Sequence, residues 1–205
     1  MNVSDPTAMV RESYDRLGSR FGDARSPTKG LDLVGRAIDG LALGSKVLDV
    51  GCGPGVPIMR FLVEQGLAVT GIDVSAQQLR IAAEQVPEAD LCVGDICEAD
   101  IADDTYDAIV AWDSVFHIPR EKHGALFDRF ARWLRPGGRL LVTGGGSAGE
   151  FTDVMLGETF FYSGFDPERV TQLLVVAGFA VVEQVADGRS GRGHVVFIAE
   201  RRGPA

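Results

Sequence analysis

The chain has 205 residues, of which 45% are hydrophobic and 24% are charged, proportions typical of one folded domain. Its formal net charge of −9 would repel a polyanion, so we expect no nucleic-acid partner. No apolar run is long enough to span a bilayer, and the opening stretch MNVSDPTAMVRESYD lacks the features of a secretory signal, so no membrane association is expected. The three cysteines have no zinc-type spacing; we expect free thiols in a reducing cytoplasm and no metal site.

The N-terminal part shows two amphipathic helical patterns. Apolar residues recur at helical spacing at Val10, Tyr14, Leu17 and Phe21, and again at Val34, Ala37, Ile38 and Leu41. We therefore expect residues 1–44 to form a helical cap on a core of residues 45–202. Without a linker or an internal repeat, the whole of 1–205 is expected to be a single domain.

From Lys46 onward, short apolar runs alternate with helical periods, a pattern typical of βαβ units and a parallel sheet. The expected strands are KVLDVG, LAVTGIDV, ADLCVG, YDAIVAW, RLLVTG, AVVEQV and HVVFIAE. Only a short loop separates the last two, so they should be antiparallel neighbours. The sequence thus predicts an α/β fold with a Rossmann-like, doubly wound sheet of seven strands.

Capping signals place several helices between these strands. Ser75 and Gln78 form a capping box, and Asp166 should cap a helix that has Pro167 at its first position. A helix from about Glu121 to Leu134 should stop at a turn formed by Arg135-Pro136-Gly137-Gly138. The segment Gly144–Phe165 has no clean periodicity, so we expect an irregular connection. Its aromatic residues either line a substrate pocket or pack on the N-terminal helices.

The turn after the first strand is rich in glycine and preceded by an acid. Asp49-Val50-Gly51-Cys52-Gly53-Pro54-Gly55 has the spacing G-x-G-x-G; Val56 departs from the dinucleotide fingerprint, and no Walker lysine follows. The Asp49 carboxylate would repel a pyrophosphate but suits a ligand that carries an ammonium and a sulfonium. Asp73 ends the second strand, where an acid can accept hydrogen bonds from ribose hydroxyls. Asp95 follows the third strand and is placed to accept a bond from an adenine amine.

The motifs VLDVGCGPG, GIDVS, GDIC, YDAIVAWDSVFHI and LRPGGRLLVTG resemble, in order, those of the class I S-adenosylmethionine-dependent methyltransferases. VRESYDRLGSRFGD resembles the helical lid of small-molecule members. The resemblance implies the strand order 3-2-1-4-5-7-6 with an antiparallel last strand, and S-adenosylmethionine as cofactor, with S-adenosylhomocysteine as its product. The cofactor-binding residues that we expect are Tyr14, Asp49, Gly51, Cys52, Gly53, Asp73, Val74, Gly94, Asp95, Ile96 and Trp112.

Candidate catalytic residues follow the fourth strand. Methyl transfer mainly needs positioning and desolvation, and a base helps only when the acceptor must lose a proton. Asp113, Ser114 and His117 are our candidates, of which Asp113 and His117 are preferred. Alternatively, His117 hydrogen-bonds a backbone carbonyl and lines the cofactor pocket, and Asp113 is structural. His123 is expected at the surface, and His194 is expected to be structural.

The expected function is methylation, at oxygen or nitrogen, of a small-molecule acceptor by a cytoplasmic monomer or homodimer. One alternative is a protein or RNA methyltransferase, and another is a non-catalytic protein that binds S-adenosylmethionine. An NAD-dependent oxidoreductase is disfavoured by Val56.

Overall fold

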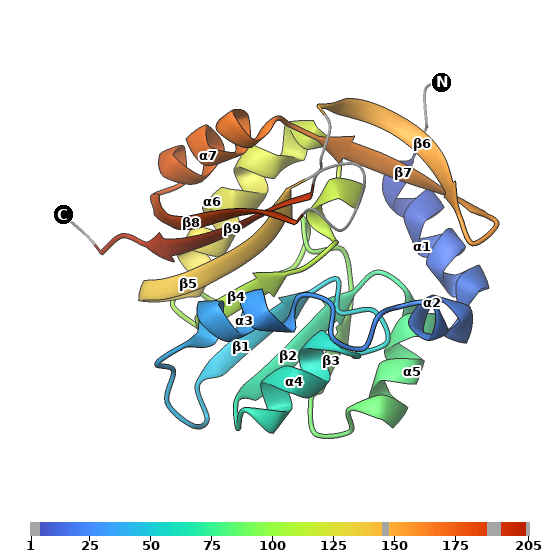
Figure 1. Cartoon of the computed structure of the whole chain (residues 1–205), viewed down its shortest axis with the longest axis horizontal. Coiled ribbons are helices and arrows are strands. Elements are labelled where there is room, and N and C mark those ends of the chain that lie inside the picture. The colour runs from blue at the N-terminus through green and yellow to red at the C-terminus, as the bar shows by residue number, and fades with distance from the viewer. Residues whose placement is uncertain (1–4, 145–147, 188–193, 204–205) are drawn as a thin grey trace.

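Seven strands form the central sheet in the order β3-β2-β1-β4-β5-β9-β8 (Figure 1). The computed structural model describes residues 5–144, 148–187 and 194–203. The strands are β1 (Lys46–Val50), β2 (Ala68–Asp73), β3 (Asp90–Val93), β4 (Tyr106–Ala111), β5 (Leu134–Gly144), β8 (Phe179–Asp187) and β9 (His194–Arg201). The first five are parallel, and β9 is antiparallel to both β5 and β8. Since β8 and β9 are the sixth and seventh strands of this sheet, the expected order is confirmed.

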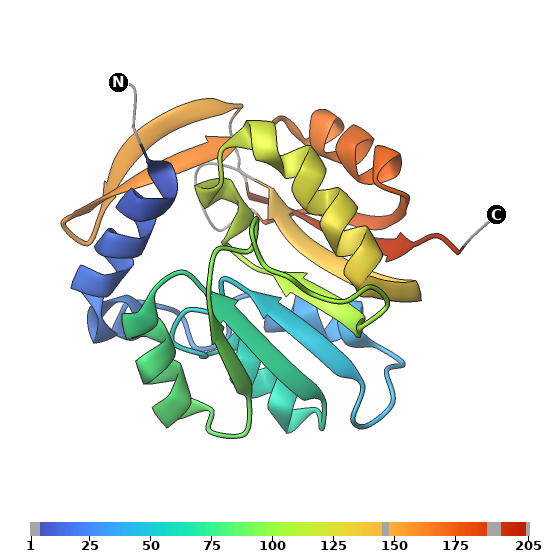
Figure 2. The same cartoon turned by 180° about the vertical axis from the view of Figure 1, so that it is seen from behind.

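Helices cover both faces of the sheet (Figures 1 and 2). One face carries α3 (Leu31–Ile38), α4 (Ile58–Glu64) and α5 (Ala76–Gln85), and the other carries α6 (His123–Trp133) and α7 (Pro167–Val176). Side chains of a strand alternate between the two faces. In β4, Ala108 and Val110 therefore join the cluster around α3 and α4, whereas Ile109 and Ala111 join the cluster around α6 and α7.

Both expected N-cap residues are in place, but the reciprocal bond of the capping box is not formed, because the backbone N–H of Ser75 donates to Asp73 Oδ1 and the Gln78 side chain bonds the N-terminal helix. Ser75 Oγ accepts from the backbone N–H of Gln78 at 3.1 Å, and Asp166 Oδ1 accepts from that of Arg169 at 2.9 Å. These bonds satisfy N–H groups that have no partner within the helix. Both helices accordingly start where the sequence placed them.

The helix α6 differs from expectation at both ends. A short 3-10 turn, Arg120–Lys122, precedes it after Pro119. At its C-terminal end, Leu134 already belongs to β5 and pairs with Tyr106. The expected Pro-Gly-Gly turn lies inside β5. The register between β4 and β5 shifts at these residues, and the next pair is Ala108 with Arg139. The strand absorbs the turn residues as an irregularity at its start.

Two predictions for the parts outside the central sheet were wrong in detail. The helical period from Val10 to Phe21 is split into α1 (Pro6–Leu17) and α2 (Ser19–Asp23), because Gly18 adopts a φ of 51° between them. The segment expected to be irregular forms a hairpin of β6 (Gly149–Met155) and β7 (Glu158–Gly164); its positions 145–147 lie outside the described residues. Both views show this hairpin beside α1, past one edge of the sheet (Figures 1 and 2).

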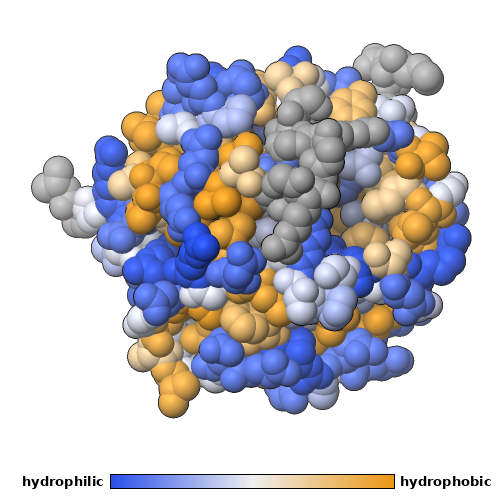
Figure 3. Space-filling view, viewed as in Figure 1, coloured by the Kyte–Doolittle hydropathy of each residue, from blue (hydrophilic) through white to orange (hydrophobic). Residues whose placement is uncertain are grey.

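The sequence pattern does not indicate the hairpin, because β7 is buried on both faces. Phe160 and Phe161 are adjacent and both at most 5% exposed, so the strand shows no alternation of polar and apolar residues. Across the hairpin, Phe151, Val154 and Leu156 keep apolar side chains at the surface. Figure 3 shows apolar residues at the surface on the side where the hairpin and α1 lie, to the right of the view. Among the described residues, no helix has both the length and the apolar character to cross a membrane.

Candidate functional site

The glycine-rich turn leads from β1 into α4 and lies at the carboxyl end of the sheet. Gly51, Gly53 and Gly55 have φ values of 68°, 55° and 82°, which residues other than glycine rarely adopt. A Cβ at Gly51 would lie 2.5 Å from Ser114 Cβ, so the close approach of the β4 loop also requires glycine there. The turn is therefore built to bring bare backbone to the edge of the sheet.

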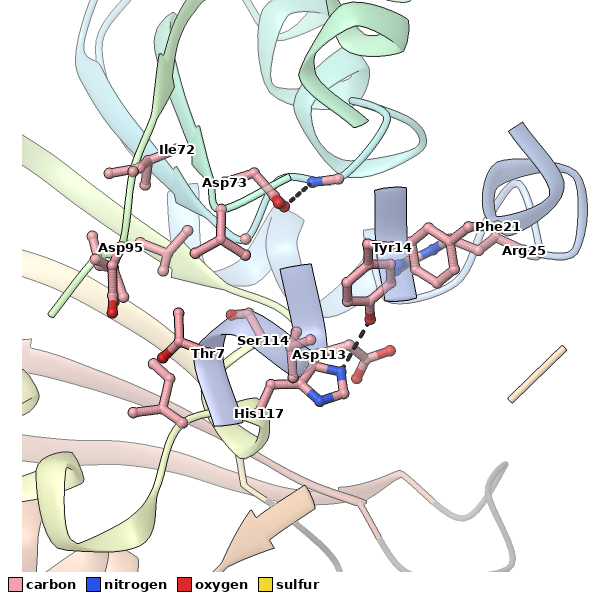
Figure 4. Close-up of a pocket in the computed structure, with 18 residues that line it drawn as sticks. Thr7, Tyr14, Phe21, Arg25, Ile72, Asp73, Asp95, Asp113, Ser114 and His117 are labelled. Carbon is pink, nitrogen blue, oxygen red and sulfur yellow. Dashed lines mark hydrogen bonds between the residues drawn. The ribbon is translucent and has the colours of Figure 1, made fainter. Parts of the chain in front are cut away.

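A cavity of about 80 Å³, here called the donor cavity, lies between this turn and α1 (Figure 4). Asp73 stands at its wall; its Oδ2 accepts from Gly53 N–H at 2.9 Å and its Oδ1 from Ser75 N–H at 2.8 Å. Burial raises the pKa of Asp73, and these backbone hydrogen bonds oppose the rise. Asp95, in the same wall, accepts from Cys97 N–H at 2.9 Å. Each carboxylate keeps lone pairs for a ligand.

Asp49 and Arg25 form a second feature beside the turn. Both line a small recess of about 10 Å³ that they share with Trp112. Asp49 is 2% exposed, and burial raises its pKa to about 7 although the positive charge of Arg25 lowers it. Within the described part of the chain, Asp49 Oδ2, Arg25 Nε and Trp112 Nε1 are buried without hydrogen-bond partners. Such groups are costly unless a ligand satisfies them, so the recess suits a ligand with both an ammonium and a carboxylate.

Tyr14 and His117 meet at the mouth of the donor cavity. His117 Nδ1 lies 2.8 Å from the carbonyl oxygen of Phe161, which can only accept, so Nδ1 carries the hydrogen. Nε2 then accepts from the Tyr14 hydroxyl at 3.0 Å (Figure 4). Burial lowers the pKa of His117 to about 4 and raises that of Tyr14, so both are neutral near pH 7. His117 thus contacts a backbone carbonyl and lines the pocket, and any proton it receives from the acceptor would pass through Tyr14.

A larger cavity of about 530 Å³, here called the acceptor cavity, adjoins the donor cavity. The two share five lining residues, Tyr14, Phe21, Arg25, Asp113 and His117. The acceptor cavity extends between the loop after α2, the short helix η1 (Val115–His117) and the β6–β7 hairpin.

Asp113 is held at this junction by two contacts. Its Oδ2 lies 2.7 Å from Lys29 Nζ, and its Oδ1 lies 3.3 Å from His194 Nδ1. Burial alone would raise the pKa of Asp113, but His194 and Lys29 outweigh it and lower the value to about 2. Asp113 also has a φ of 51°, and its backbone N–H donates to Thr143 Oγ1 at 2.7 Å. The carboxylate is therefore ionised and fixed in place.

The structure brings most of the expected residues together. Those lining the donor cavity are Tyr14, Gly51, Gly53, Asp73, Val74, Gly94, Asp95, Ile96, Asp113, Ser114 and His117. Asp49, Cys52 and Trp112 line only the adjoining recess. The indole of Trp112 packs under Gly30, where a Cβ would lie 2.5 Å from Cζ2, so Trp112 supports the recess from the side of the cap.

One histidine expectation was wrong. His123 is 4% exposed rather than at the surface, because its Nε2 bonds the carbonyl oxygen of Ile118 at 2.8 Å. His194, expected to be structural, contacts Asp113 and also lines the acceptor cavity. The sequence reasoning also missed Arg25 and Lys29. No motif surrounds them, and the only available signal was two positive charges in the loop that follows the cap's aromatic residues.

The arrangement of the sheet, the glycine-rich turn and the two joined cavities defines a class I methyltransferase fold. Residues 47–138 match the family model described as a methyltransferase domain. The resemblance seen in the sequence is thus confirmed over this part of the chain.

Similar proteins include phosphoethanolamine N-methyltransferase 3 of Arabidopsis thaliana, 35% identical over 136 residues that cover 63% of this chain and 27% of that protein. The 27-O-demethylrifamycin SV methyltransferase of Amycolatopsis mediterranei is 35% identical over 108 residues, covering 50% of this chain and 39% of that protein. The chain therefore spans well under half the length of these curated relatives. The structure of magnesium protoporphyrin IX methyltransferase from Synechocystis PCC 6803, with bound S-adenosylmethionine, superposes with a TM-score of 0.77. The superposition covers 98% of this chain and all of the Synechocystis chain. At 19% identity, this similarity shows a shared fold.

Proposed function

We propose that this chain transfers a methyl group from S-adenosylmethionine to a small-molecule acceptor and releases S-adenosylhomocysteine. The observation that carries the proposal is the juxtaposition of Asp49 and Arg25 beside the glycine-rich turn, because Asp49 Oδ2 and Arg25 Nε are buried there without hydrogen-bond partners among the described residues. A zwitterionic amino acid satisfies both, whereas a diphosphate would satisfy only Arg25 and be repelled by Asp49.

The rest of the donor follows along the edge of the sheet. Asp49 would accept from the ammonium, and Arg25 and the Trp112 indole N–H would donate to the carboxylate. Asp73 would accept from the ribose hydroxyls and Asp95 from the adenine amine, since Asp73 ends β2 and Asp95 follows the neighbouring strand β3. The sulfonium then lies between these two ends of the ligand, near the shared wall of the two cavities.

The acceptor would be positioned from the other side of that wall. Tyr14 and His117 line both cavities, and their hydrogen bond fixes the two rings at the junction. The surrounding aromatic residues keep water from the reacting atoms, which strengthens the electrostatic interactions there. The chain's contribution is thus to orient and desolvate, while the sulfonium supplies the activated methyl group.

A small acceptor is supported by the form of the acceptor cavity and by the relatives. The cavity lies between the cap and the hairpin, and the relatives named above methylate an aminoalcohol phosphate and a rifamycin. We further propose one domain over 1–205, with its cap in 1–44 and its core in 45–202, acting as a monomer or homodimer without nucleic acid. The free thiols of Cys52, Cys92 and Cys97 support a cytoplasmic location.

Calorimetric titration tests the donor. We expect S-adenosylhomocysteine to bind and NAD to bind far more weakly, and the Asp49→Ala variant to lose most of the affinity. Asp103→Ala, an exposed acid outside both cavities, is the matched control. Preferential binding of NAD would refute the proposal. Release of S-adenosylhomocysteine during incubation with a panel of small acceptors tests the transfer, and tight binding without turnover on any acceptor would instead assign a binding protein.

A further inference from the structure

The acceptor cavity contains a carboxylate that is already neutralised. Asp113 has one oxygen 2.7 Å from the Lys29 ammonium and the other 3.3 Å from the His194 ring. Its side chain is only 12% exposed and its Oδ1 is buried beside His194, so an incoming cation would have to compete with Lys29 for Oδ2. That exchange would leave the partly buried Lys29 ammonium without its counter-ion, which is unfavourable. Asp113 therefore does not serve as the receptor of a cationic acceptor.

The group beside Asp113 that can still form hydrogen bonds with a ligand is a donor, the Lys29 ammonium. An ammonium has three N–H groups, and Lys29 directs one of them to Asp113. Lys29 lines the cavity and keeps 29% of its side chain exposed, so its other N–H groups are accessible from the cavity. They require lone pairs from a partner, and an oxygen that carries negative charge satisfies them best.

Aromatic rings form a row that leads away from this charged group. Phe116 lies 5.5 Å from the His194 ring and stacks on Tyr162 at 5.8 Å with an interplanar angle of 28°. Tyr162 in turn stacks on Phe151 of β6 at 5.5 Å and 17°. All four rings line the acceptor cavity. Ring surfaces of this kind favour a flat partner by offset stacking or edge-to-face contact.

We infer that the methyl acceptor is a flat aromatic molecule with an anionic oxygen, its ring along Phe116 and Tyr162 and its oxygen at Lys29. The inference rests on the proposed function and names the substrate class of the same site. Lys29 is then the residue that selects for the charge of the acceptor. It forms the ion pair that neutralises Asp113, and its remaining N–H groups can bind the oxygen of the acceptor. Removing Lys29 changes the charge that the site presents to the acceptor from positive to negative, since Asp113 is left without its ammonium partner.

The test uses two ligands that share a ring and differ in charge. Binding of 4-hydroxyphenylacetate and tyramine is measured by NMR titration of the full chain saturated with S-adenosylhomocysteine, with further phenolic acid and phenolic amine pairs and with phosphoethanolamine. We expect the acids to bind at least about tenfold more tightly than the amines, the effect of one charge-assisted hydrogen bond. In Lys29→Met the preference should reverse, and in Lys29→Arg it should persist.

Controls separate this inference from the proposed function. Lys46→Met removes a positive charge at the opposite edge of the sheet and should leave the preference unchanged. The double variant Lys29→Met/Asp113→Asn removes both partners and should bind acids and amines equally. Amines or phosphoethanolamine binding as tightly as the acids, an unchanged preference in Lys29→Met, or no binding by any aromatic ligand would each overturn the inference. Failure of S-adenosylhomocysteine itself to bind would overturn the proposed function instead.

Discussion

Asp49 is the group whose titration can be predicted most sharply. Burial raises its pKa from 3.8 to about 7, so the folded chain holds a proton over a range in which the unfolded chain has lost it. The stability that this proton contributes is complete below about pH 4 and is lost as the pH rises to about 7. The full loss corresponds to about 4 kcal/mol, of which about 2 to 3 kcal/mol falls between pH 5 and pH 8.

The Asp49→Asn variant isolates this effect. His117 acts in the opposite direction, because its pKa is lowered to about 4 and its contribution to stability therefore grows as the pH rises from about 4 to about 6.5. The pH profile of the wild type alone mixes these two groups. The difference between variant and wild type removes the His117 contribution, and any fixed cost of the buried amide is the same at every pH.

Urea unfolding of both proteins at pH 5 and pH 8, followed by circular dichroism, measures that difference. The free energy of unfolding of Asp49→Asn relative to wild type should be about 2 to 3 kcal/mol higher at pH 8 than at pH 5. A difference that stays constant between the two pH values would show that the pKa of Asp49 lies outside this range. The argument from its burial would then be wrong.

The same reasoning extends to ligand binding. The ammonium of S-adenosylhomocysteine should favour the ionised form of Asp49, so binding at pH 6 should release about one proton. Calorimetry in two buffers of different ionisation enthalpy measures the release, and Asp49→Asn should show none. Proton uptake on binding would contradict the placement of the ammonium at Asp49.

Three substitutions test other parts of the site. Arg25→Met should weaken S-adenosylhomocysteine binding about 10- to 100-fold in calorimetry, with Arg25→Lys retaining part of the affinity, because a charged hydrogen bond to the carboxylate is lost; full affinity in Arg25→Met would exclude that bond. Tyr14→Phe should lower the free energy of unfolding by about 1 to 3 kcal/mol, since His117 Nε2 loses its buried donor, and an unchanged urea midpoint would argue against the hydrogen bond. Gly30→Ala should lower the melting temperature, because its Cβ meets the Trp112 indole at a φ of 82°; melting at the wild-type temperature would contradict this packing.

The sheet and the donor side of the site could be predicted from the sequence because their signals are local. The strands show short apolar runs, and the glycine-rich turn directly follows the first of them. Asp73 ends β2 and Asp95 follows the parallel neighbour β3, so their meeting at one edge of the sheet follows from topology alone. Only the irregular start of β5 departed from this reasoning, since the strand incorporates residues that ordinarily form a turn.

The acceptor side could not be predicted because its contacts join distant segments. Tyr14 and His117 are 103 positions apart, and Lys29 and Asp113 are 84 positions apart. Within the cap, Tyr14 shows only the spacing of a helix, and Lys29 has the appearance of an ordinary loop residue. In the hairpin that completes the cavity, β7 is buried on both faces, which removes its period of two.

The cap and the core contribute complementary groups to the site. The cap supplies Arg25, Lys29 and Tyr14, whereas the core supplies the carboxylates and His117. Neither part is sufficient, because Asp49 and Asp113 are buried acids whose nearest positive charges come from the cap.

The docking of α1 on α5 is therefore a condition for the chemistry. Asp15 accepts from Ser75 Oγ at 2.7 Å, and the Gln78 side-chain amide donates to the carbonyl oxygens of Tyr14 and Gly18 at 3.1 and 2.9 Å. Ser75 is also the N-cap of α5, two positions after Asp73, and accepts there from the backbone N–H of Gln78. The same short segment thus ends the strand that carries the ribose-binding acid, starts the helix and fixes the cap, so that donor binding and acceptor selection depend on one set of contacts.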